Sequence, residues 1–256
     1  MMTTVNDIFE NLNELAPVSL KMDFDNVGIL VGNVTNSIKK CLIALDITDE
    51  VIDEAISDGA ELIVSHHPVI FEAQKAVLED DLVGGKLVKL IRNGISAVCM
   101  HTNLDIARGG VNDALMDALG CKSEDALDYD GCGRIGEYEG AIEFKEFLKQ
   151  CKEALKTKGL RYYYAGIPVK KIAVMGGSGG GCVLLAKEKG CDTYVTADIK
   201  YNQFLDAKEL GINLVDADHF CTENVIVPVL HDRLSKAFPD VKFKISEAHQ
   251  QTVCFM

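Results

Sequence analysis

The feature that most constrains the fold is an internal repeat in the order of its predicted elements. Residues 40–64 and residues 171–195 run in the same order: a strand, a loop, a helix, a glycine and a second strand. After each stretch comes another helix, a Gly-Ile pair, a further strand and then a histidine followed four residues later by an acid. These paired endings are His101 with Asp105, and His219 with Glu223. Such self-similarity predicts a duplicated structural unit.

The elements of this repeat predict the fold class. Apolar runs of strand length, such as 41–47 and 95–100, alternate with stretches of helical periodicity, such as 83–92. This alternation is typical of an α/β layered sheet with parallel pairing. We therefore predict a duplicated α/β layered fold with two related halves facing each other across a cleft. Residues 120–140 are rich in Gly, Asp and Glu, so we place the seam there and divide the chain into halves 1–125 and 126–256.

Histidines concentrate at the ends of predicted buried strands. Of the six histidines in the chain, His66 and His67 follow one such strand, His101 follows another, and His219 follows the equivalent strand of the second half. The carboxyl ends of strands are where α/β sheets place their ligand sites. We expect His231 and His249, which lie elsewhere, to be surface residues.

These histidines, together with the acids that follow two of them, predict a two-metal site. Imidazoles and carboxylates are the ligands of zinc, iron, manganese and nickel. A bridging carboxylate holds two such ions about 3.5–4 Å apart. The predicted ligands are His66, His67, Asp105, His219 and Glu223. His101 is a further candidate, as a ligand, a partner of a ligand or an acid–base group, and we favour the last two roles.

Charge and composition exclude several classes of function. The net charge of −13 opposes broad binding to the phosphates of nucleic acid. No uncharged apolar run is long enough to span a bilayer, and acids precede any apolar stretch at the N-terminus, so we expect a cytoplasmic protein. The nine cysteines include no Cys-x-x-Cys pair, so we expect reduced, structural thiols.

A glycine-rich loop at residues 176–181 joins a predicted strand to a predicted helix. Phosphates are often held by backbone N–H groups at such junctions. The loop matches neither the P-loop nor the dinucleotide-binding pattern. Two interpretations stay open: a phosphate cradle, or a tight turn packed against a metal or a partner.

Several motifs in order resemble the NIF-three-like family, whose members are often named as homologues of GTP cyclohydrolase I type 2. They are Asp25-Asn26-Val27-Gly28, Ser65-His66-His67-Pro68, His101-Thr102-Asn103-Leu104-Asp105, Gly131-Cys132-Gly133-Arg134-Ile135-Gly136 and His219-Phe220-Cys221-Thr222-Glu223. The resemblance runs nearly end to end. It implies a dinuclear metal site with the five ligands named above, Glu223 bridging, and a toroidal homohexamer. Members of the family commonly have glycine where this chain has Asp218.

The leading hypothesis is a metal-dependent hydrolase acting on a small-molecule substrate, in which water activated by the metals attacks an electrophilic carbon or phosphorus. The resemblance implies GTP, opened at C8 of the purine, with His101 as the catalytic proton shuttle. Two alternatives stay open: a metal-binding regulatory or scaffold ring without catalysis, and a phosphoesterase or amidohydrolase using the same metals.

Overall fold

The computed structural model describes residues 2–256. Their contacts divide into two compact units: unit 1, which runs to Ala107 and also includes Val227–Gln250, and unit 2, which is Arg108–Ile226 with Gln251–Met256. The units are therefore not consecutive stretches of sequence, because residues 108–125 pack in unit 2 and residues 227–250 return to unit 1. The division into halves 1–125 and 126–256 stays a prediction about the duplication. No helix among residues 2–256 is long and apolar enough to cross a membrane.

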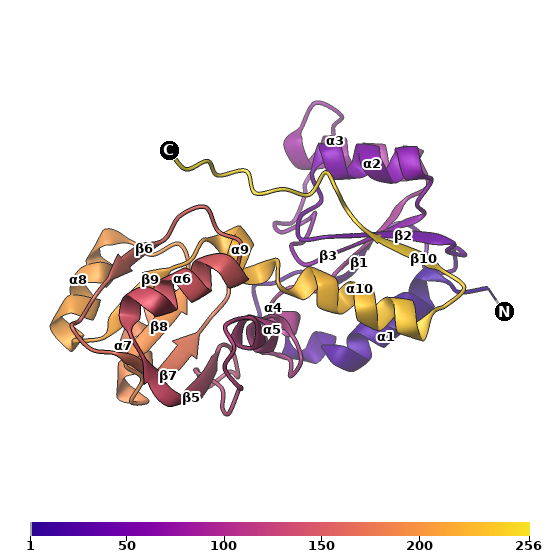
Figure 1. Cartoon of the computed structure of the whole chain (residues 1–256). Helices are drawn as coiled ribbons and strands as arrows, with labels where there is room; N and C mark the ends of the chain where they lie inside the picture. The colour runs from indigo at the N-terminus through magenta and orange to yellow at the C-terminus, as the bar shows by residue number, and fades with distance from the viewer. Residues whose placement is uncertain (1) are drawn as a thin grey trace. The chain divides into compact units, whose positions relative to one another are not determined.

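Unit 1 is a five-stranded sheet with helices on both faces (Figure 1). Its elements are α1 (Val5–Leu15), η1 (Val18–Leu20), β1 (Gly28–Val31), β2 (Lys40–Ala44), α2 (Asp49–Asp58), β3 (Leu62–Ser65), α3 (Leu82–Arg92), β4 (Ser96–Cys99), α4 (Thr102–Ile106), α10 (Ile226–Ala237) and β10 (Lys242–Ile245). The strand order is β1-β4-β3-β2-β10, with β1 antiparallel to β4 and all other neighbours parallel.

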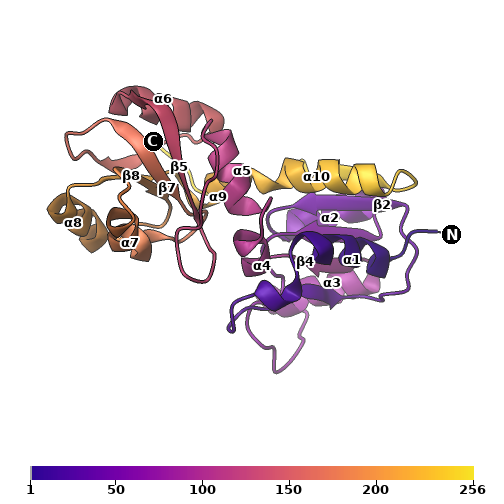
Figure 2. The ribbon, with the colours of Figure 1, turned by 90° about the horizontal axis from the view of Figure 1, so that it is seen from below.

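Side chains along the strands of this sheet point alternately to its two faces, and both faces are buried. Leu42, Ile63 and Ala97 belong to the apolar core that also contains the inward faces of α2 and α3. The strand residues that alternate with these point to the opposite face and are equally buried, namely Cys41, Ile43, Leu62, Val64 and Val98. Figure 2 shows α1 and α10 on that side. A sheet covered on both faces explains why its central strands read as continuous apolar runs.

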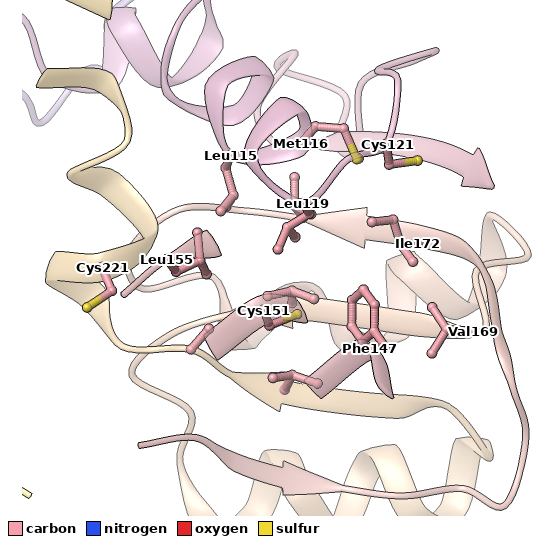
Figure 3. Close-up of a cluster of buried hydrophobic side chains, with 14 of the residues drawn as sticks. Leu115, Met116, Leu119, Cys121, Phe147, Cys151, Leu155, Val169, Ile172 and Cys221 are labelled. Carbon is pink, nitrogen blue, oxygen red and sulfur yellow. The ribbon is translucent and has the colours of Figure 1, made fainter. Parts of the chain in front are cut away.

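Unit 2 is a second five-stranded sheet, ordered β5-β7-β8-β9-β6. Its elements are α5 (Val111–Ala118), β5 (Arg134–Ile142), α6 (Phe144–Ala154), β6 (Arg161–Tyr163), β7 (Val169–Val174), η2 (Gly180–Cys182), α7 (Val183–Glu188), β8 (Thr193–Thr196), α8 (Tyr201–Leu210), β9 (Asn213–Asp216) and α9 (His219–Glu223). Strands β7, β8 and β9 are parallel, and the edge strands β5 and β6 run antiparallel to them. A cluster that includes Leu115, Phe147 and Ile172 packs α5 and α6 against one face of the sheet (Figure 3).

The two sheets share a central motif, which confirms the predicted α/β class. In each, three parallel strands follow in chain order, β2-β3-β4 in unit 1 and β7-β8-β9 in unit 2. An antiparallel strand borders the third strand in both sheets, namely β1 and β6. The sheets differ at the other edge, where β10 is parallel to β2 but β5 is antiparallel to β7.

Candidate metal centre

In unit 1, two histidines directly follow β3, and the fold fixes how each imidazole is turned. His66 is fully buried and its Nδ1 lies 2.9 Å from the backbone oxygen of Met100. His67 Nδ1 lies 2.8 Å from Oδ1 of Asp46, which comes just after the neighbouring strand β2. A carbonyl and a carboxylate accept but do not donate, so Nδ1 carries the proton in both rings. Nε2 of each ring is then the atom with a lone pair for a metal.

His101 stands after β4 and is held in the same way. Its Nδ1 donates to Oδ1 of Asp25 at 2.8 Å, and the other oxygen of Asp25 accepts from the backbone N–H of Thr102 at 3.0 Å and from its hydroxyl at 2.5 Å. Burial on its own would raise the pKa of Asp25, but the hydrogen bonds and the charge of His101, with those from Thr102, hold that pKa well below its ordinary value. Asp25 is therefore an anion that orients His101.

The three imidazoles and one carboxylate form a group of donors in unit 1. His66, His67 and His101 each offer a ring nitrogen, and these nitrogens lie within 4.8 Å of one another. Asp105, on α4, approaches the group with Oδ1 3.6 Å from Nε2 of His66. The parallel order β2-β3-β4 causes this gathering, because the carboxyl ends of parallel strands meet at one edge of a sheet.

Unit 2 gathers one imidazole and one carboxylate on the short helix α9. His219 and Glu223 are four residues apart, so they share a helix face, and Nε2 of His219 lies 3.1 Å from Oε2 of Glu223. Nδ1 of His219 lies 2.7 Å from Oδ2 of Asp198, which follows β8. Burial on its own would lower the pKa of His219, but the hydrogen bonds and charges of Glu223 and Asp198 outweigh it and raise that pKa to about 9.

The helix that carries this pair begins at a strained residue. Asp218 is the N-cap of α9, and its side chain accepts a hydrogen bond from the backbone N–H of Cys221 at 3.1 Å. Its φ of 75° lies in a region that favours glycine. An aspartate at this position thus provides a side-chain cap at the expense of an unfavourable backbone conformation.

The glycine-rich loop packs against the unit 2 donors, and several of its backbone N–H groups are already used within the protein. Three of its backbone N–H groups already donate within the protein: Gly176 to Asn112, Gly177 to Thr222 and Gly179 to Thr196. A Cβ at Gly177 would come within 2.1 Å of Glu223 Oε1 and 3.1 Å of His219 Nε2. Of the two interpretations of this loop, the tight turn packed against a metal-binding group is the one that these contacts favour.

Both donor groups have the chemistry that a divalent metal requires. In unit 2, the proton on Nε2 of His219 faces a carboxylate, and a metal ion at that position satisfies the same two donors. In unit 1, the lone pair on Nε2 of His66 and Oδ1 of Asp105 face each other, and a cation between them is what two such acceptors require. All four imidazoles are turned by an oxygen acceptor at Nδ1, which is the arrangement of histidines that bind metals. The chain thus has groups that can bind a metal ion.

The structure therefore places every predicted site residue beside at least one other. His66, His67, His101 and Asp105 come together in unit 1, and His219 with Glu223 in unit 2. Sequence reasoning missed the carboxylates that turn the imidazoles, namely Asp25, Asp46 and Asp198. A signal for Asp198 was present, since it follows the predicted strand that ends at Thr196, whereas Asp46 lies within the strand predicted at 41–47 and the observed strand β2 ends before it.

Comparison with known proteins gives a consistent result over nearly the whole chain. Residues 3–252 match the model of the family described as Duf34/NIF3 (NGG1p interacting factor 3). The chain is 39% identical over 253 residues to a protein of Clostridium perfringens named "GTP cyclohydrolase 1 type 2 homolog", covering 95% of this chain and 96% of that protein. A protein of the same name from Clostridium acetobutylicum is 38% identical over 247 residues, covering 93% of this chain and 91% of that protein. The fold matches a crystal structure of a Bacillus cereus protein related to NIF3 with a TM-score of 0.92 and 26% identity, over 100% of this chain and 99% of that one.

Proposed function

The chain belongs to the Duf34/NIF3 family, and we propose that it is a dinuclear metal-dependent hydrolase that opens the purine ring of GTP. The five proposed ligands of the two ions are His66, His67, Asp105, His219 and Glu223, with Glu223 bridging. Zinc, iron, manganese and nickel all suit imidazole and carboxylate donors. The name of the clostridial relatives supplies the substrate to test.

The observation that carries this proposal is that all four imidazoles are oriented in the same way. Each of the four has Nδ1 held by an oxygen acceptor, so the same nitrogen, Nε2, is presented in every case. Unrelated surface histidines have no reason to share an oxygen acceptor at the same ring nitrogen. When bound, a pair of divalent ions supplies positive charge that polarises the substrate and lowers the pKa of water at the site.

His101 is the proposed proton carrier. Asp25 holds its Nδ1–H, so Nε2 is the atom that exchanges a proton. In the proposed reaction a water adds to C8 of the purine and the bond from C8 to a ring nitrogen breaks, leaving a formamide. Nε2 takes the proton from the water and returns it to the departing nitrogen. A second water then releases C8 as formate.

The first test is GTP turnover by full-length protein reconstituted separately with manganese, iron and zinc, with formate and metal content both measured. We expect His66→Ala to lose metal and turnover together, and His101→Ala to keep its metal while losing roughly 100-fold or more in turnover. His231→Ala is the matched control, because Nδ1 of His231 lies 3.3 Å from Oδ1 of the adjacent Asp232 on α10 and its ring belongs to neither donor group.

Two results would contradict the proposal at different levels. Protein that holds two ions per chain and releases no formate with any of the three metals would overturn ring opening of GTP. Protein that binds no metal, or whose metal content is unchanged in His66→Ala, would overturn the ligand assignment. The toroidal homohexamer is part of the same proposal, and sedimentation velocity of the metal-loaded protein measures it.

A further inference from the structure

Two phenylalanines stand exposed beside the unit 1 donors. Phe24 is 64% exposed and Phe71 is 48% exposed, and their ring centroids lie 6.3 Å apart at an interplanar angle of 66°. Phe71 in turn lies 6.0 Å from the ring of His101, nearly perpendicular to it at 84°. Single exposed apolar residues need no explanation, but a pair in contact with a candidate catalytic imidazole does.

The loops that carry these rings are fixed by hydrogen bonds rather than loosely exposed. The turn that presents Phe24 is closed by the backbone N–H of Asp25 donating to the backbone oxygen of Met22 at 3.0 Å. The next residue, Asn26, donates from its side chain to the backbone oxygen of Ile70 at 2.6 Å, which joins this turn to the loop that presents Phe71. The same Asp25 turns His101. One set of contacts therefore positions both the acid–base group and the two rings.

The rings continue inward without interruption. The centroid of His101 lies 5.1 Å from that of His66 and 5.5 Å from that of His67. A run of aromatic contacts therefore leads from solvent at Phe24 to the fully buried His66. Binding sites for small molecules have this composition, with apolar and aromatic lining beside a few convergent polar groups.

We propose that Phe24 and Phe71 bind a planar heteroaromatic ring, such as a purine, and hold its edge toward His101. The inference rests on the proposed function, since it names the substrate class of the same site. A small planar ligand fits the patch better than a protein does, because a stable protein interface needs about 20–30 residues on each side. The edge-to-face angle leaves ring faces available, and aromatic faces bind a base by stacking whatever its hydrogen-bonding pattern.

The experiment uses full-length, metal-loaded protein and measures binding without turnover. The chain has no tryptophan, so Phe71→Trp places the protein's one indole at the proposed stacking position, where it can be excited selectively over the tyrosines. The probes are guanosine, which is planar and uncharged, and inorganic tripolyphosphate, which has no ring. We expect guanosine to quench the fluorescence of Phe71→Trp and tripolyphosphate to leave it unchanged.

Calorimetry with the other variants sharpens the result. We expect Phe71→Ala to weaken guanosine binding by roughly tenfold or more, and Phe24→Ala by a smaller factor, while tripolyphosphate affinity and metal content stay at wild-type values. Tyr129→Ala is the matched control, because Tyr129 is a highly exposed ring in unit 2 that lies under the ammonium group of Lys189. That variant is expected to bind guanosine as wild type does.

Three outcomes would overturn the inference and leave the metal-dependent hydrolase to its own test. The first is wild-type protein with its full metal content that binds no guanosine. The second is equal guanosine affinity in wild type and Phe71→Ala. The third is a change of oligomeric state in Phe24→Ala or Phe71→Ala by sedimentation, which would assign the patch to contact between copies of this chain. Loss of metal in His66→Ala tests the hydrolase separately, since neither phenylalanine is a proposed ligand.

Discussion

The two donor groups offer similar atoms but are built in different ways. In unit 1 the imidazoles follow β3 and β4 and the carboxylate that turns His67 follows β2, so three neighbouring strands set the geometry. In unit 2 both donors stand on α9, a helix of five residues, and a glycine loop packs against them. A sheet edge is a rigid support, whereas a single helical turn depends on its cap and on what it packs against.

The repeated histidine-to-acid pattern also leads to different pairings. His219 is the first residue of α9, and it pairs with the acid of its own motif, Glu223. His101 is the N-cap of α4 and lies one position earlier relative to its helix, and it is held by Asp25 instead. The acid of that motif, Asp105, approaches His66. The same spacing in sequence thus pairs His219 with the acid of its own motif, whereas His101 pairs with an acid from elsewhere in the chain.

The largest effect that would test this contrast is expected at Gly177. Its φ of 62° and its contact with Glu223 and His219 leave no room for a Cβ, so Gly177→Ala should displace both unit 2 donors. The strained backbone alone costs on the order of 1–3 kcal/mol. We expect a loss of metal affinity and a lower melting temperature, measured by metal titration and calorimetry. Gly181→Ala is the control in the same loop, because a Cβ there meets nothing within 4 Å.

If Gly177→Ala bound metal as tightly as Gly181→Ala, the loop would not support the donors. The contrast would then fail, because unit 2 would hold its pair as firmly as the sheet edge of unit 1 does.

A smaller effect is expected from the carboxylates that turn the imidazoles. Asp46→Asn and Asp198→Asn keep the shape of the side chain and remove its charge, so each should weaken metal binding, by about tenfold at the lower end of such effects. The loss should be larger for Asp198→Asn, because His219 is the only histidine that unit 2 contains, whereas unit 1 gathers three imidazoles at its sheet edge. Isothermal titration with zinc measures both. Asp232→Asn, beside His231, is the control, and equal losses in the first two variants would contradict the difference between the groups.

The fold was largely predictable because its elements have strong local signals. Gly59, the glycine of the first repeat, ends α2 with a φ of 64°, and the helix predicted at 83–92 is α3, Leu82–Arg92. The strand that completes the sheet of unit 1 was not predictable in this way. β10 lies at the end of the chain and pairs with β2, so its place depends on contacts between residues some 200 positions apart, which no local pattern records.

The residues of the candidate site also differ in whether the local sequence could identify them. His66, His67 and His101 were identifiable because each follows a buried strand, which is a feature of the local sequence. Asp25 belongs to one of the sequence motifs, but its role could not be predicted. It comes 76 residues before His101 and precedes β1 rather than following a parallel strand. Its function depends on the antiparallel pairing of β1 with β4, which places the start of β1 beside the end of β4.

In unit 1, the contacts between α2 and residues 244–248 predict that the free energy of unfolding depends on pH. Glu54 on α2 accepts hydrogen bonds from the Ser246 hydroxyl and the Ala248 backbone, and pairs with Lys244 at 2.9 Å. Burial on its own would raise the pKa of Glu54, but these partners lower it from 4.5 to about 2. A depressed pKa contributes stability that is present above pH 4.5 and lost as the pH falls toward 2. The free energy of unfolding, measured with urea between pH 4.5 and pH 2, should fall less steeply with decreasing pH in Glu54→Gln than in wild type. An equally steep fall in the variant would contradict the role of this carboxylate.

The smallest effect concerns the strained start of α9, where Asp218 has a positive φ. Asp218→Ala removes the cap and keeps an unfavourable φ, so it should lose about 1–2 kcal/mol of stability. Asp218→Gly also removes the cap but relieves the backbone, so the two changes nearly offset and its melting temperature should lie closer to wild type. Either change also removes the contact of Asp218 with Gln251, so Gln251→Ala serves as the control for that loss. If the alanine variant proved as stable as the glycine variant, the backbone at Asp218 would carry no strain, and the cap alone would account for the residue.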